Sequence, residues 1–182
     1  MRERMTDLNL AIWSRDANNQ TTYPNTAGVY ALFLNKGATI PDVQPGKFGL
    51  IYVGLGQGLR GLAARSHFRG KTASHSPRRS LSALLADELG LRPIFIRKPS
   101  GATTFKLDKA SEQLLDQWME HNLSVALKPS DNPVGYEREL IRHWEPPLNC
   151  DKKVCPLNAQ QLFVLDRRDK FKVFAARLAG NG

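Results

Sequence analysis

Cysteines and long apolar runs are both scarce in this sequence of 182 residues. Its two cysteines, Cys150 and Cys155, are too few for a disulfide framework, although one local bridge between them stays open. No stretch approaches the ~20 consecutive apolar residues of a membrane span, and the N-terminal MRERMTDLNLAIW carries charges before any apolar run. We therefore predict a cytoplasmic protein without a membrane segment.

Acidic residues are missing from a long part of the chain. No Asp or Glu occurs from Val43 to Ala86, and residues 43–107 contain eleven Lys or Arg against Asp87 and Glu88 alone. Eleven minus two equals the whole formal net charge of +9, so the two flanking segments are neutral. A basic surface attracts phosphates and releases counterions from nucleic acid. The charge distribution predicts a nucleic-acid partner, and the alternative is a solvated basic face.

The length and the hydrophobic content of 41% predict one compact domain. Short β-branched and aromatic runs indicate strands, whereas apolar residues spaced by three and four indicate helices, several of them with Ser, Asp or Asn caps. The first two strands are expected to pair antiparallel across a long loop. The predicted strands are 27–35, 49–54, 92–97 and 123–128, and the predicted helices are 59–68, 77–89, 108–121, 132–144 and 160–178.

Glycines follow the second predicted strand in the segment GLIYVGLGQG, residues 49–58. Their positions match neither the dinucleotide-binding nor the P-loop spacing, so we predict a tight strand-to-helix turn instead of a phosphate loop. Tyr52 lies at the strand end near Gly54, whose small size would let a ligand come close. Alternation places Tyr52 on one face with Leu50 and Gly54, and we expect it on the same face of the strand pair as Tyr30.

A carboxylate occupies the apolar stripe of the helix predicted over 132–144. Glu137 precedes Leu140 and Ile141 by three and four residues, so it shares their face, whereas Glu139 lies on the solvated face. An inward carboxylate is costly unless a cation or a donor compensates it. Two interpretations stay open for Glu137: an ion pair with an arginine, or a ligand for Mg²⁺.

Several short motifs follow one another in a fixed order. They are GVY at 28–30, YVG at 52–54, an Arg and a His in the next helix, Glu137 before Leu140 and Ile141, and PPLN at 146–149. Together they resemble the GIY-YIG nuclease family over residues 27–149. The resemblance implies an α/β fold of the α+β type, with a small three-stranded antiparallel sheet flanked by helices and further helices and strands. It also implies hydrolysis of DNA phosphodiester bonds with one divalent metal ion. We expect 1–26 to pack on this domain as an extension and 150–182 to form its helical tail.

The resemblance implies roles for the matching residues. Glu137 would bind the metal ion, Mg²⁺ or Mn²⁺. Tyr30 would take the proton of the attacking water, while Tyr52 would orient that water or the phosphate and is the reserve candidate for the base. Because a phenol has a pKa of about 10, nearby positive charge would have to lower it. Asn149 would position the backbone or a water molecule.

The resemblance also implies that an arginine and a histidine act on the phosphate. Arg65 would clamp the phosphate and His67 would assist proton transfer. These two are two residues apart instead of the family's usual four, so Arg60 and His75 stay open as alternatives. We predict contacts with DNA backbone phosphates for five basic residues: Arg60, Arg69, Lys71, Arg78 and Arg79.

Two other hypotheses stay open. Cys150, Cys155 and the nearby His143 could belong to a zinc site, although no fourth ligand is evident. The chain could also be a non-catalytic, basic nucleic-acid-binding module that retains the fold. We expect an enzyme, because both tyrosines, the glutamate and the asparagine of the motifs are present.

Overall fold

The computed structural model describes residues 11–13, 26–56, 68–69 and 71–180. Its main sheet is antiparallel in the order β1-β6-β2-β3. The three central strands are β2 (Gly28–Leu34), β3 (Leu50–Gly56) and β6 (Leu123–Pro129), and the short β1 (Ala11–Trp13) extends the sheet along β6. The predicted three-stranded antiparallel sheet with flanking helices is therefore confirmed, with one added edge strand.

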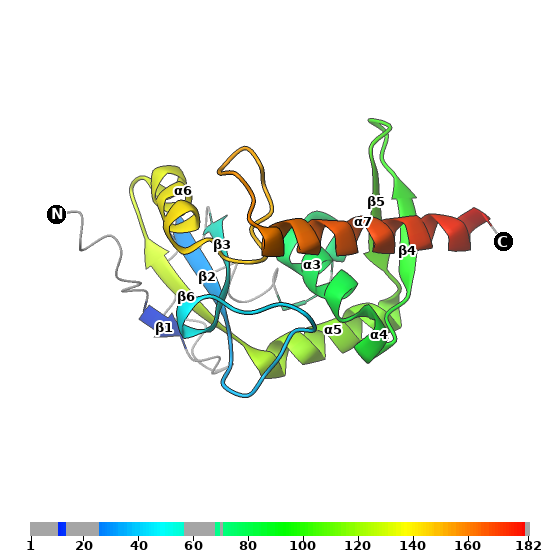
Figure 1. The fold of residues 1–182 in the computed structure, drawn as a ribbon, viewed down its shortest axis with the longest axis horizontal. Helices are drawn as coiled ribbons and strands as arrows, with labels where there is room; N and C mark the ends of the chain where they lie inside the picture. The colour runs from blue at the N-terminus through cyan, green and yellow to red at the C-terminus, as the bar shows by residue number, and fades with distance from the viewer. Residues whose placement is uncertain (1–10, 14–25, 57–67, 70, 181–182) are drawn as a thin grey trace.

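Helices cover both faces of this sheet (Figure 1). A two-stranded hairpin pairs β4 with β5 and stands apart from it. The remaining elements are η2 (Lys47–Gly49), η4 (Thr72–Ser74), α3 (Ser76–Leu84), α4 (Ala86–Leu89), β4 (Pro93–Arg97), β5 (Thr103–Leu107), α5 (Lys109–Asn122), α6 (Pro133–Trp144) and α7 (Ala159–Gly180).

Strand alternation divides the core into two parts. Successive side chains of a strand point to opposite faces, so Tyr30 and Leu32 face one side of β2 while Val29 and Ala31 face the other. The first side is buried in a large cluster with residues of α3, α5 and α7, and the second is buried against α6. In Figure 1, α6 lies at one end of the molecule, while α7 crosses α3 and continues beside the hairpin. Elements from both faces therefore meet near the edge strand β3.

Local sequence explains where the helices begin and end. The Asp108 carboxylate accepts a hydrogen bond from the Ser111 amide at 2.7 Å, and the Asn132 side chain accepts one from the Gly135 amide at 3.1 Å. Both are N-cap interactions that satisfy free amides of the first turn. Gly90, with φ of 62°, ends α4 in the left-handed conformation that glycine adopts without strain. None of the described helices is long and apolar enough to cross a membrane.

Several sequence predictions differ from the structure in detail. The helix predicted over 77–89 is divided at Leu85 into α3 and α4. The strand β5 was not predicted, because its sequence TTFKL contains fewer large apolar residues in a row than the predicted β4, PIFIR. The helix predicted over 59–68 lies outside the described residues except for Phe68.

A bulge in β3 changes the predicted side-chain pattern. Tyr52 pairs with Leu32 but Leu50 pairs with Phe33, so Ile51 is an extra residue at this point of the ladder. Leu50 consequently packs on the α6 side of the sheet, while Ile51 and Tyr52 lie on the opposite side. The prediction that Leu50 shares a face with Tyr52 was wrong, whereas the shared face of Tyr30 and Tyr52 is confirmed.

Candidate active site

The two motif tyrosines are in contact. Their ring centroids are 5.9 Å apart with an interplanar angle of 38°, and the Tyr30 hydroxyl is hydrogen-bonded to that of Tyr52. A Cβ atom on Gly54 would lie 2.5 Å from the Tyr30 hydroxyl oxygen and 2.7 Å from Cε1 of Tyr52. Gly54 is therefore required because the tyrosines pack over it. The prediction that it leaves room for a ligand was wrong, since Tyr30 fills that space.

The two hydroxyls have different environments. Burial raises the pKa of Tyr30 well above its ordinary value, and the neighbouring Tyr52 and Glu137 raise it further. Burial also raises the pKa of Tyr52, to about 12, but the hydrogen bond from Tyr30 and the charges of Arg79 and Arg168 oppose this rise. Tyr30 is only 4% exposed, while Tyr52 is half-buried and lines a cavity. Tyr52 is therefore the tyrosine that a bound molecule can reach.

Asn149 fixes the strand that carries Tyr52. Its side-chain oxygen accepts a hydrogen bond from the Val53 amide at 2.8 Å, and its side-chain nitrogen donates to the Val53 carbonyl at 2.7 Å. The Leu148 amide also donates to the Ile51 carbonyl at 3.0 Å. The PPLN segment thus occupies part of the edge of β3 and satisfies backbone groups that the sheet leaves open. Asn149 acts here on the backbone beside Tyr52.

A cavity of about 180 Å³ opens at this edge of the sheet. It brings together side chains from β3, the start of α3, α6 and the segment after the PPLN motif. The residues that line it are Tyr52, Ser76, Glu137, Ile141, Asn149, Cys150, Asp151 and Val154. Three residues chosen from the sequence motifs, Tyr52, Glu137 and Asn149, therefore meet in one place.

Glu137 is the carboxylate that faces this cavity from α6. It is half-buried, and burial raises its pKa; the charge of Asp151 raises it further, while Arg138 opposes the rise. Glu137 makes no ion pair or hydrogen bond with any described residue. Of the two interpretations of its inward position, an ion pair with an arginine is not formed among the described residues, which do not include Arg60 and Arg65. Two carboxylates in one cavity are a donor set suited to Mg²⁺ or Mn²⁺, because hard cations prefer oxygen ligands.

The start of α3 adds polar groups to the same region. His75 precedes the cavity-lining Ser76, and burial lowers the pKa of His75 below its ordinary value, an effect that the charges of Arg78 and Arg79 increase. The lowered pKa favours the neutral form of this imidazole. Burial raises the pKa of the Cys150 thiol to about 11, so this cysteine is protonated.

Two arginines act electrostatically on Tyr52. Arg79 is one of the five residues predicted to contact DNA phosphates, whereas Arg168 was not singled out from the sequence. Arg79 is half-buried on α3, and its Nη1 donates to the Ala73 carbonyl at 3.0 Å. Its Nε is buried and has no partner among the described residues. Arg168 on α7 is also half-buried. Both charges act on Tyr52, as its pKa indicates.

Arg78 does not fit its predicted contact with DNA. Its side chain is fully buried between α3 and α5, where Nη2 lies 2.7 Å from carboxylate oxygens of both Glu112 and Asp116. The Nη1 atom also lies 3.6 Å from the sulfur of Met119. A guanidinium compensated in this way cannot reach a phosphate outside the protein. The prediction for Arg78 was wrong because a run of charge along the sequence does not tell which members face inward.

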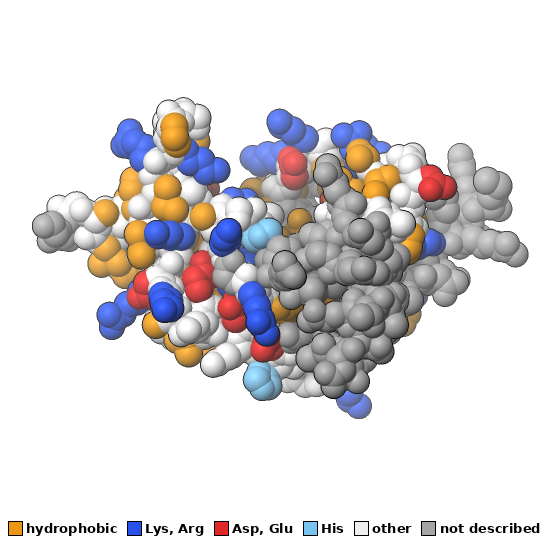
Figure 2. Space-filling view, turned by 180° about the vertical axis from the view of Figure 1, so that it is seen from behind, with side chains coloured by type: hydrophobic (Ala, Val, Ile, Leu, Met, Phe, Trp, Pro, Cys, Tyr) orange, Lys and Arg blue, Asp and Glu red, His pale blue; other side chains and the backbone are white. Residues whose placement is uncertain are grey.

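Of the other residues predicted to contact DNA, some are exposed and some lie outside the described residues. Arg69 and Lys71 are exposed. Arg60 and the candidate pair Arg65 and His67 lie outside the described residues. On the face drawn in Figure 2, Lys and Arg side chains are interspersed with Asp and Glu side chains.

The hypothetical zinc site is not formed. In the described part of the chain no three His, Cys, Asp or Glu side chains gather as metal ligands, and His143, Cys150 and Cys155 all belong to that part. Both cysteines are free thiols, so the local bridge is not formed either. His143 instead packs edge-on against Trp144, with ring centroids 4.9 Å apart.

Comparison with known proteins identifies the family of this chain. A family model described as the GIY-YIG catalytic domain matches residues 28–168, which is most of the chain. The chain belongs to this family, whose catalytic domain is that of nucleases acting on nucleic acid and generally using divalent metals. No curated protein and no solved structure matches the chain.

Proposed function

We propose that the protein is a metal-dependent endonuclease that hydrolyses DNA phosphodiester bonds in the cavity beside Tyr52. The observation that carries this proposal is Glu137, a half-buried carboxylate without a partner among the described residues, which shares a cavity with Tyr52. A buried carboxylate without a cation or a donor is costly. A cation that binds in this cavity would supply the missing positive charge. A bound Mg²⁺ or Mn²⁺ would compensate the Glu137 carboxylate and also the negative charge of a DNA phosphate.

Glu137 would hold the metal ion, and Asp151 on the same cavity is a second candidate ligand. The bound ion would act as a Lewis acid that polarises the phosphate. Magnesium is commonly held by one or two carboxylates, with substrate phosphate and water completing its ligands. The two carboxylates of this cavity agree with that pattern.

Tyr52 is the better candidate for the general base. This reverses the roles implied by the family resemblance, in which Tyr30 takes the proton and Tyr52 orients the water or the phosphate. Tyr52 reaches the cavity. Burial raises its pKa to about 12, while the hydrogen bond from Tyr30 and the charges of Arg79 and Arg168 oppose that rise, and a bound cation would stabilise the phenolate further.

Tyr52 would first have to lose its own proton to solvent; the resulting phenolate would then accept a proton from the attacking water as the new bond from water oxygen to phosphorus forms. One ester bond to phosphorus then breaks, and the leaving alcohol takes up a proton. Tyr30 would orient Tyr52.

Asn149 would act as a positioning residue. Its two hydrogen bonds to Val53 hold the backbone next to Tyr52, so they set where the phenol lies. The exposed Arg69 and Lys71 are candidates for contacts with DNA backbone phosphates, as phosphate contacts fix the register of a nucleic acid. Roles for Arg60, Arg65 and His67 stay predictions.

Nicking of supercoiled plasmid tests the proposal. We expect relaxed and linear products with Mg²⁺ or Mn²⁺ and none with a chelator. A parallel set of linear, flapped and damaged duplexes would identify the preferred DNA. The alternative function, a binding module that retains the fold, predicts that DNA is retarded in a gel but stays intact with either metal. That outcome would contradict the enzyme.

A further inference from the structure

A buried stripe on α7 contains one arginine. The fully or nearly buried residues of this helix are Gln161, Val164, Phe171 and Ala175, spaced by three, seven and four. Arg168 lies between Val164 and Phe171 at helical spacings of four and three, so it belongs to the same inward face. A guanidinium on an inward stripe is costly unless something compensates it.

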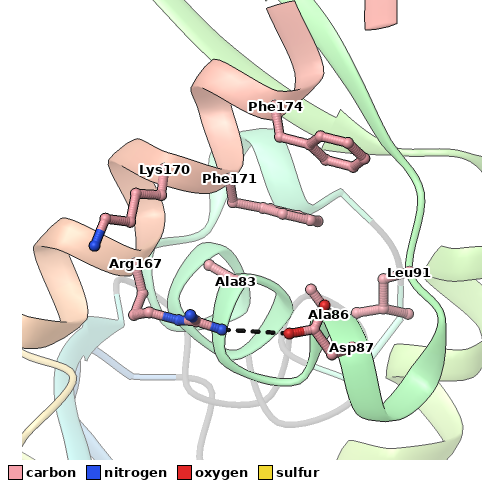
Figure 3. A pocket seen from close by; sticks show the side chains of 8 residues that line it. All are labelled: Ala83, Ala86, Asp87, Leu91, Arg167, Lys170, Phe171 and Phe174. Carbon is pink, nitrogen blue, oxygen red and sulfur yellow. Dashed lines mark ion pairs between the residues drawn. The ribbon is translucent and has the colours of Figure 1, made fainter. Parts of the chain in front are cut away.

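Other cations of α7 are paired with carboxylates. Lys170 and Lys172 are paired with Asp166 and Asp169, at 2.7 Å and 2.9 Å. Arg167 reaches across a cavity of about 250 Å³ towards Asp87 of α4, at 3.7 Å (Figure 3).

Adjacent residues of a helix point about 100° apart, so Arg168 faces a different side from Arg167. Arg168 forms no ion pair or hydrogen bond with any described residue. Among the described residues the inward arginine is therefore uncompensated, whereas Arg167, Lys170 and Lys172 are paired.

Arg168 and Arg79 do not themselves line the Tyr52 cavity, but the helix that carries Arg168 packs against two of the segments that form it, α3 and the PPLN segment. The first turn of α7 is tied to the PPLN segment, because Nε2 of the buried Gln161 donates to the Pro146 carbonyl at 3.1 Å. Arg168 lies seven residues further on, about 10 Å along the helix axis. In the same region α7 packs against α3, which carries Arg79.

Electrostatic effects agree with this position. The charge of Arg168 lowers the pKa of Tyr52 and also that of Cys150, and both side chains line the cavity. Burial lowers the pKa of Arg79, and the charge of Arg168 lowers it further. The two guanidinium groups are therefore close enough to repel each other. Neither is joined to a carboxylate among the described residues, so an anion bound between them would be stabilised by both.

We propose that Arg168 of α7 and Arg79 of α3 form a guanidinium pair that binds the phosphodiester group of the nucleic-acid substrate beside Tyr52. The proposal rests on the proposed nuclease function. Guanidinium groups suit this task because their planar donors match phosphate oxygens, and the charge that develops in the transition state is stabilised by fixed donors. The C-terminal helix would then complete the active site in addition to covering the core.

Kinetics of Arg168→Ala and Arg168→Lys test the pair, with Arg177→Ala as the matched control. Arg177 is an exposed arginine on the same helix. Loss of one fixed donor to the transition state typically costs about 10²–10³ in kcat, so we expect that decrease for Arg168→Ala with a smaller change in KM. Arg168→Lys should retain part of the activity, and added guanidinium ion should partly rescue Arg168→Ala. A merely structural arginine would show no such rescue.

Binding of inorganic phosphate separates this inference from the nuclease proposal. Phosphate should raise the melting temperature of the wild type and of Arg177→Ala, but not that of Arg168→Ala. Equal stabilisation of all three proteins would overturn the guanidinium pair, as would cleavage by Arg168→Ala at the control rate. If the wild type binds phosphate through Arg168 but cleaves no DNA, the nuclease proposal fails and the anion site stands.

Discussion

Two half-buried glutamates, Glu112 and Glu137, differ in whether the protein provides partners for the carboxylate. Glu112 on α5 accepts hydrogen bonds from the Thr72 amide at 2.9 Å, the Thr72 hydroxyl at 2.8 Å and Arg78 at 2.7 Å. Burial would raise the pKa of Glu112, but these donors outweigh it and the pKa is lowered. Glu137 has no such partner among the described residues, and its pKa is raised by burial.

The comparison separates a structural carboxylate from a candidate functional one. Burial alone does not distinguish them, since both side chains are half-buried. The difference is that the protein supplies its own cation and donors to Glu112, whereas it leaves Glu137 facing a cavity. A carboxylate of the second kind destabilises the free protein slightly and gains its compensation on binding a cation. The following changes test whether the two glutamates differ in this way.

Glu137→Gln should give the largest effect on cleavage. The substitution keeps the shape of the side chain but removes the charge that would hold the metal ion. We expect Mg²⁺-dependent cleavage to fall by about 10³-fold or more, comparable with the loss of a fixed electrostatic group in other active sites. The melting temperature should stay equal or rise, because the neutral amide is easier to bury than a carboxylate. Retained cleavage would contradict the metal-ligand role.

Glu112→Gln should give the opposite pattern. The substitution removes one of the two carboxylates that compensate the buried Arg78 and leaves only Asp116. Loss of a partner of a buried ion pair costs up to about 3 kcal/mol. Chemical denaturation should therefore show a large loss of stability, while the cleavage rate per folded molecule stays near that of the wild type. Glu88→Gln, at an exposed position, is the matched control. A cleavage defect as large as that of Glu137→Gln would remove the distinction between the two sites.

The tyrosines should differ in the same assay. Tyr52→Phe removes the hydroxyl that reaches the cavity, so we expect at least about a 10²-fold lower rate, the low end for a lost general base. Tyr30→Phe removes the hydrogen bond to Tyr52 and should lower the rate less. If the Tyr30 variant loses more activity, the base is Tyr30 as first expected from the family resemblance. Normal cleavage by both variants would make them structural residues.

Acid should affect the Glu112 cluster in a defined pH range. Because the folded pKa of Glu112 is lowered, its contribution to stability is complete above the unfolded pKa of about 4.5. The contribution is lost as the pH falls through the lower folded pKa. Melting temperatures measured from pH 6 down to about pH 3 should therefore fall less steeply for Glu112→Gln than for the wild type. Parallel curves would mean that Glu112 carries no such linkage.

Glu139→Ala should have the smallest effect. Glu139 lies on α6 two residues from Glu137 but is exposed, so a change there is expected to stay within about 0.5 kcal/mol in stability. Cleavage should be close to that of the wild type. A loss like that of Glu137→Gln would show that the assigned faces of α6 are wrong.

Helical spacing in the sequence was sufficient to find Glu137 but was not applied to the basic residues. Arg78 precedes Leu81 by three residues and Leu85 by seven, so it belongs to the inward stripe of α3 as Glu137 belongs to that of α6. The same spacing identifies Arg168 on α7. Counting charge along the chain obscured both, because net charge does not distinguish an exposed arginine from one that faces the core.

Other features depend on contacts between distant parts of the chain. Asn149 was recognised from the PPLN motif, but its partner Val53 is 96 residues away and no local pattern indicates it. The extra residue Ile51 in β3 was likewise not predictable from local sequence, because the alternation of side chains assumes a regular ladder of paired residues. The pairing of β2 with β3 and the Asp108 and Asn132 caps were predicted, because they join segments that are close in the sequence. The expected Ser cap is not formed, since the N-cap of α3 is His75.

Binding of Mn²⁺ in the presence of an oligonucleotide tests most directly whether the Glu137 cavity accepts a cation. Water-proton relaxation would report the bound ion in the wild type and in the Glu137→Gln, Glu139→Gln and Glu112→Gln variants. We expect the wild type, Glu139→Gln and the folded fraction of Glu112→Gln to bind Mn²⁺ alike, and Glu137→Gln to lose the site. Equal binding by Glu137→Gln and the wild type would contradict the account, because the ion would then be held elsewhere.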